Sequence, residues 1–95
     1  MNDYSEFPPK AYLMLVLKQA PQVAHTYIQM WQSRNIQDKF ICKKSDIRNN
    51  FLISPTLFRN HMLPLVGLGL ASIDESPKMF VIDLVGYDED FFEEN

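Results

Sequence analysis

The stretch that decides the fold runs from Ile47 to Ile73 and reads IRNNFLISPTLFRNHMLPLVGLGLASI. Ile47 and Phe51 are four residues apart, a spacing that places two apolar side chains on one face of a helix. Ser54 followed by Pro55 is typical of a helix start, because serine caps free backbone N–H groups and proline fits the first turn. The stretch therefore predicts two helices joined by a very short turn.

The rest of the chain carries helix and strand patterns on both sides of this stretch. Apolar residues recur at helical spacing before it. Two apolar runs follow it, and five turn-forming or charged residues separate them, which predicts a β-hairpin. The expected order is helix, helix, short strand, helix, helix and hairpin, at residues 10–19, 21–33, 39–42, 44–51, from 55 to the glycines at 67 and 69, 70–73 and 79–85.

Residues 7–85 resemble a winged helix-turn-helix domain, most closely the small N-terminal modules of plasmid and phage replication initiators and more distantly stand-alone regulators. The resemblance is carried by apolar spacing, one serine cap and one Leu-Gly-Leu sequence, at Ile47, Phe51, Ile53, Ser54 and residues 68–70. It implies an α+β fold of about four helices, a short strand and a C-terminal β-hairpin that forms the wing. We expect one domain over residues 1–87, followed by an acidic-aromatic tail at 88–95.

Three features depart from the family pattern. Leu52 occupies the turn position that usually holds glycine, so we expect a strained left-handed backbone there. Pro64 lies inside the second helix of the motif, where it removes a hydrogen bond and predicts a kinked or shortened helix, and Gly67 weakens the last turn. Asp74 and Glu75 fall in the expected wing tip, where acidic side chains repel phosphate.

Charge is distributed unevenly along the chain. The net charge is −3, yet five of the twelve acidic residues lie between 88 and 94, so residues 1–87 hold nine basic and seven acidic side chains. Residues 34–59 hold six basic and two acidic side chains. Such asymmetry indicates a basic working surface and an acidic tail. An ordinary solvated face is the alternative interpretation.

The resemblance predicts which side chains contact DNA, because the start of the second motif helix enters the major groove. There, arginine can bind guanine and asparagine can bind adenine, each with two hydrogen bonds, while threonine reaches a phosphate or a thymine methyl. Lysine and arginine on the preceding helix pair with phosphates. The candidate residues are Lys43, Lys44, Arg48, Thr56, Arg59, Asn60 and Lys78 on the wing. A merely solvated helix face remains the competing interpretation.

Other chemistry is sparse in the sequence. His25 and His61 have no ligand partners at metal-binding spacing, and Cys42 fits a small buried side chain. No phosphate loop, catalytic triad or paired carboxylates are visible, so we expect a non-enzyme without metal or cofactor. The N-terminus has no signal-peptide pattern and the longest apolar run, residues 11–17, is too short for a bilayer span. We expect a cytoplasmic protein.

Two functions follow from these patterns. The first is a small winged-helix protein that binds double-stranded DNA as a transcriptional regulator or a plasmid or phage maintenance factor. The resemblance implies a homodimer, for which Tyr12 and Ile28 are candidate contacts, although Tyr12 also fits the core by its spacing. The second is a protein-interaction module with little DNA affinity, favoured by the acidic wing, Pro64 and the tail. We expect the tail itself to be a disordered or loosely docked end. The alternatives are that it covers the basic surface or binds a partner protein through Phe91 and Phe92.

Overall fold

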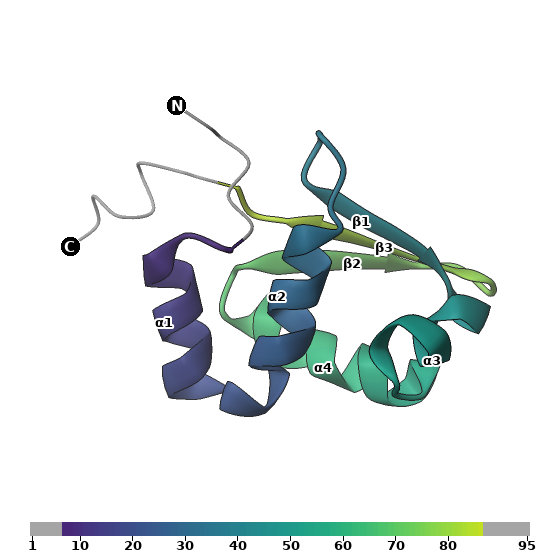
Figure 1. The fold of residues 1–95 in the computed structure, drawn as a ribbon, viewed down its shortest axis with the longest axis horizontal. Coiled ribbons are helices and arrows are strands. Elements are labelled where there is room, and N and C mark those ends of the chain that lie inside the picture. The colour runs from purple at the N-terminus through teal and green to yellow at the C-terminus, as the bar shows by residue number, and fades with distance from the viewer. Residues whose placement is uncertain (1–6, 87–95) are drawn as a thin grey trace.

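The computed structural model describes residues 7–86, so the acidic-aromatic tail lies outside the described residues. Helices gather beneath one face of a small sheet, and the turn between the last two strands extends beyond α3 (Figure 1). The elements are α1 Lys10–Gln19, the single turn η1 Pro21–Val23, α2 Ala24–Gln32, β1 Lys39–Lys43, α3 Lys44–Phe51, α4 Pro55–Gly67, β2 Ala71–Glu75 and β3 Met79–Leu84. This is an α+β domain with a winged-helix layout, which confirms the expected fold class.

The three strands form one antiparallel sheet in the order β1-β3-β2. The predicted hairpin is present, with Ala71 opposite Leu84 and Glu75 opposite Phe80. The strand β1, which comes earlier in the sequence, pairs with the other edge of β3. The last residue of β1, Lys43, lies opposite Met79. Residues separated by more than thirty positions in the sequence therefore meet at one end of the sheet.

The core lies between the sheet and the helices. The predicted inner face of α4 is confirmed, because Phe58, Met62 and Leu65 are fully buried. The predicted alternation of β3 is also confirmed, since every second residue of the strand is buried. Four aromatic rings meet at the centre, those of Phe40, Phe51, Phe58 and Phe80. The ring centroids are 4.9 Å apart for Phe58 and Phe80 and 5.1 Å apart for Phe51 and Phe58. This cluster fixes α3 and α4 against the sheet.

Tyr12 is a core residue, and its candidacy as a dimer contact is wrong. Its side chain is fully buried together with that of Val16, one turn later on α1. The hydroxyl donates a hydrogen bond of 2.7 Å to the carbonyl of Gly86, which satisfies the polar end of the ring. The interaction ties α1 to the residues that follow the sheet, so it cannot be available to a second chain.

The turn between α3 and α4 adopts the strained conformation that the sequence predicts. Leu52 caps α3 with φ 62° and ψ 26°, in the left-handed region, and its side chain is 84% exposed. Its backbone N–H donates to the carbonyl of Arg48 at 2.8 Å, which closes the end of the helix. Because the side chain buries little apolar surface, the packing of Leu52 does not offset the backbone strain.

Replacing Leu52 with glycine should raise the free energy of unfolding by about 0.5–1 kcal/mol. The left-handed conformation costs a residue with a Cβ roughly 1–2 kcal/mol, and part of the gain is lost to the greater freedom of glycine in the unfolded chain. Urea denaturation measures the difference. Leu52→Ala is the matched control, since it removes the exposed side chain but retains the Cβ. Equal stability of the two variants would contradict the account.

The helix α4 passes through Pro64 and ends at Gly67, so the expected shortening at the proline does not occur. The carbonyl of Pro64 accepts a hydrogen bond of 2.9 Å from Leu68, which continues the helical pattern past the missing donor. Gly69 has φ 77° and directs the chain into β2, so the glycine at this position is required by the backbone.

Candidate nucleic-acid interface

The start of α4 is capped as the sequence predicts. The Ser54 hydroxyl accepts a hydrogen bond of 3.0 Å from the backbone N–H of Leu57, and Pro55 occupies the first turn. The cap fixes where the helix begins and therefore which side chains point outward. Thr56 and Asn60, four residues apart and thus on one face, are both exposed. Two of the candidate base-reading residues thus lie together on the outer face of α4.

Leu63 lies further along the same outer face, and Leu57 and Val66 lie on opposite flanks of it. Leu63 is 64% exposed, and Leu57 and Val66 are each about two-fifths exposed. The sequence places Leu63 on this side, but it does not reveal Leu57 or Val66, because both fit an apolar face equally well. The polar side chains Thr56 and Asn60 therefore lie in the first turns of α4, beside exposed apolar ones.

Arg59 is held by a carboxylate that the sequence assigns to the wing tip. Its Nε and Nη2 donate to the two carboxylate oxygens of Glu75, at 2.8 Å and 2.5 Å. Lys44 Nζ donates to the same carboxylate at 2.5 Å. Glu75 is the last residue of β2 and not part of the turn, because it pairs with Phe80 in the sheet. One acidic side chain thus links α3, α4 and the wing.

The ion-pair cluster of Arg59, Lys44 and Glu75 is strongly ionised. Hydrogen bonds from Arg59 and then from Lys44 lower the pKa of the Glu75 carboxyl to about 2. The hydrogen bond to Glu75 in turn raises the pKa of the Arg59 guanidinium. Two cations share one anion, so the cluster keeps a net positive charge.

The contribution of the Glu75 carboxyl to the stability of the domain should depend on pH only in the acid range. Its pKa is about 2 when folded and ordinarily 4.5, so on acidification the unfolded chain takes up the proton first. The stabilisation is fully present above pH 4.5 and is lost as the pH falls towards 2. Denaturation of the native chain and of Glu75→Gln from neutral pH to acid measures this. The stability gap between them should narrow only below pH 4.5; a gap that is constant throughout would contradict the assignment.

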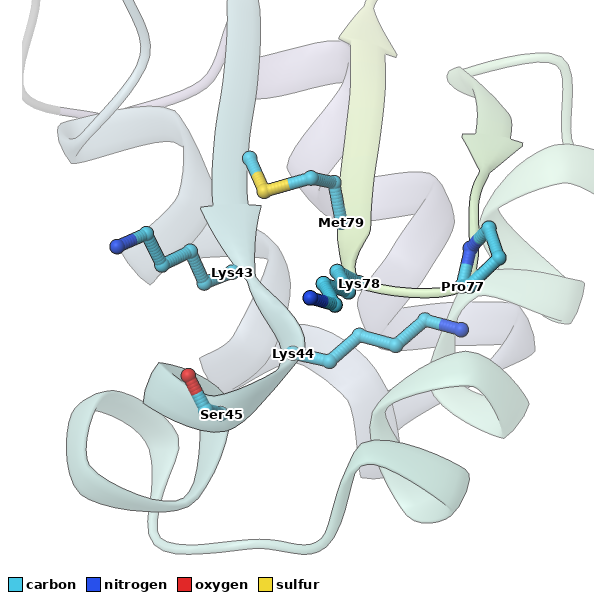
Figure 2. A pocket seen from close by; sticks show the side chains of 6 residues that line it. All are labelled: Lys43, Lys44, Ser45, Pro77, Lys78 and Met79. Carbon is cyan, nitrogen blue, oxygen red and sulfur yellow. The ribbon is translucent and has the colours of Figure 1, made fainter.

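A pocket of about 590 Å³ lies beside this cluster and is lined by three lysines and three other residues, Lys43, Lys44, Ser45, Pro77, Lys78 and Met79 (Figure 2). The pairing of β1 with β3 brings these segments together, and just beyond the paired residues the backbone N–H of Lys44 donates to the carbonyl of Lys78 at 2.8 Å. Figure 2 shows that the three ammonium groups point in different directions, with that of Lys44 on the Pro77 side and that of Lys43 on the opposite side. The arrangement suits several separated phosphates better than one small anion.

Several basic side chains of residues 34–59 are paired with acids. Arg34 pairs with Asp38 at 3.0 Å and lies over the ring of Trp31, while Lys39 pairs with Asp83 on β3. These ion pairs therefore leave fewer basic side chains available to bind phosphate than the count along the sequence suggests. Among the candidate residues, and within the described part of the chain, the cations without an ion pair are Lys43, Arg48 and Lys78.

His61 and Cys42 make local hydrogen bonds within the fold. His61 Nδ1 and Thr26 Oγ1 share a hydrogen bond at 2.9 Å, and burial lowers the pKa of the His61 ring. Cys42 is buried, as expected, and burial raises the pKa of its thiol. Residues 7–86 contain no group of three or more potential metal ligands. Over the same residues, no helix combines the length and the apolar character needed to cross a bilayer.

Comparisons with protein-family models, with curated proteins and with solved structures find no match to this chain. The fold defines it as a small α+β domain with a winged-helix layout.

Proposed function

We propose that the protein binds duplex DNA and acts as a small transcriptional regulator or a plasmid or phage maintenance factor. The supporting observation is the convergence of Lys43, Lys44 and Lys78 from two distant parts of the sequence into one pocket. This basic pocket is linked through the Glu75 ion pairs to the polar start of α4. A reading helix flanked by phosphate-binding cations is what groove recognition requires.

Each side chain has a distinct role in this proposal. Asn60 and Thr56 are exposed at the start of α4 and face the bases, where asparagine can bind adenine with two hydrogen bonds. Lys43 at the end of β1 and Lys78 in the wing turn contact phosphates. Arg48 lies four residues after Lys44 on α3, hence on the same face, and extends the phosphate contacts along the backbone.

Titration of a labelled mixed-sequence duplex at two salt concentrations tests the proposal. Three unpaired cations predict that log affinity falls against log salt with a slope of about −3, which is a loss of roughly 40-fold between about 50 and 200 mM. The same titration with Arg48→Gln should give a slope shallower by about one. Absence of any retention at the lower salt concentration would reject duplex binding.

A second candidate is a winged-helix module that binds another protein. The observation in its favour is the exposure of three apolar side chains on α4, Leu57, Leu63 and Val66, together with the largely exposed Leu52. Exposed apolar side chains gathered on one helix indicate a protein contact surface. If duplex DNA is not retained at low salt, this candidate becomes the better account of the same helix.

A further inference from the structure

The bonds between Glu75 and Arg59 use only one edge of the guanidinium group. Arginine has five N–H donors, of which Nε and one on Nη2 bind the carboxylate. The two N–H groups of Nη1 and the second on Nη2 donate to no residue in the described part of the chain. The Nη1–Nη2 edge that remains is the fork whose spacing matches O6 and N7 of guanine.

Glu75 is itself held by a second cation. Lys44 Nζ binds its carboxylate and lies 5.2 Å from the centroid of the Phe80 ring, on the strand that pairs with β2. The Glu75 side chain is 25% exposed, so it is partly sheltered from water. A carboxylate fixed by the sheet and by Lys44 restricts Arg59 to one orientation before any ligand arrives. Restricting a long side chain in advance lowers the entropy lost on binding.

We propose that Glu75 is a positioning residue that presents Arg59 to guanine in the major groove. This inference rests on the proposed function and deepens it by naming a base and the residue that enforces its recognition. The carboxylate has a second effect of opposite sign, because its negative charge repels the phosphates that surround any groove. Glu75 therefore exchanges general DNA affinity for discrimination between bases.

Selection of bound duplexes from a random-sequence pool, followed by sequencing, tests the inference with Glu75→Gln. The amide has no charge and offers a single acceptor oxygen, so it cannot bind both Nε and Nη2 of Arg59 as the carboxylate does. We expect tighter binding of the unselected pool, by several-fold at about 50 mM salt. We also expect the guanine preference at one position to fall by about 5- to 150-fold, the value of one two-pronged base contact.

Asp74→Asn is the matched control, since Asp74 is the adjacent exposed acid and makes no ion pair within residues 7–86. It should tighten binding of the pool but leave the guanine preference intact. A second comparison uses Arg59→Lys, which retains the charge and lacks the fork. This variant should lose the preference, and adding Glu75→Gln to it should cause no further loss. Thermal unfolding of each variant confirms that the domain is folded.

The outcomes separate the two proposals. If Glu75→Gln and Asp74→Asn keep the same guanine preference, the positioning role is wrong and duplex binding stands. If Glu75→Gln weakens binding to the pool as well as the preference, its role is structural, and the inference is overturned. If neither the native chain nor any variant retains duplex at low salt, the proposed function fails and the inference fails with it.

Discussion

Phe58→Ala should lower the free energy of unfolding by about 3–5 kcal/mol, the usual cost of removing a fully buried phenylalanine. Phe58 is fully buried, and its ring meets those of Phe40, Phe51 and Phe80, at centroid distances of 6.3, 5.1 and 4.9 Å. Its removal leaves a cavity where α3, α4 and the sheet meet. Domains of this size have only about 5–15 kcal/mol of stability in total, so the variant should lose a large fraction of it.

Thermal unfolding followed by circular dichroism measures the effect of Phe58→Ala, and we expect a fall in Tm on the order of 20 °C. Leu57→Ala is the matched control, because Leu57 is the preceding residue on α4 and is partly exposed. It should cost less than about 1 kcal/mol. If the two variants are equally stable, Phe58 is not the centre of the core.

Neutralising Lys43 and Lys78 together should remove most of the salt dependence of DNA binding. Each phosphate contact contributes about −0.9 to the slope of log affinity against log salt, so the double variant Lys43→Gln/Lys78→Gln should lower its magnitude by about two. With an initial slope near −3, the variant should lose most of its affinity at moderate ionic strength. Because both side chains are exposed at the rim of the pocket, the fold should be unaffected.

The double variant Lys10→Gln/Lys18→Gln is the control for total charge. Both lysines are exposed on α1, which lies at the opposite side of the molecule from α3 and the wing turn (Figure 1). Removing them changes the net charge by the same amount at a different place. If the two double variants reduce the slope equally, binding depends on overall charge and not on the pocket.

Local spacing predicts most of the fold. The third predicted helix, residues 44–51, coincides with α3, and the Ser54–Pro55 start of α4 is observed as a hydroxyl-capped first turn. Caps, glycines and apolar periodicity act over a few residues, so they can be read from the chain directly. The strained turn at Leu52 is also a local feature. The turn requires a left-handed backbone at this position, and the sequence places leucine there where glycine would adopt it without strain.

The central contact of the candidate site could not be predicted in this way. Glu75 reaches Arg59 across 16 positions and Lys44 across 31. The packing of α4 against β2 brings Arg59 to Glu75, and the β1-β3-β2 order of the sheet brings Lys44 to the same end. The sequence places Glu75 in the turn, where its charge only repels phosphate. The position of Tyr12 was ambiguous for the same reason, since the carbonyl of Gly86, its hydrogen-bond partner, is 74 residues away.

Amide chemical shifts recorded during titration with a mixed-sequence duplex test most directly whether the start of α4 and the lysine pocket form one DNA-binding surface. The account predicts the largest changes at Thr56, Asn60, Lys43 and Lys78, with α1 unaffected. Changes confined to α1 or to the apolar part of α4 around Leu63, or no changes at low salt, would contradict it.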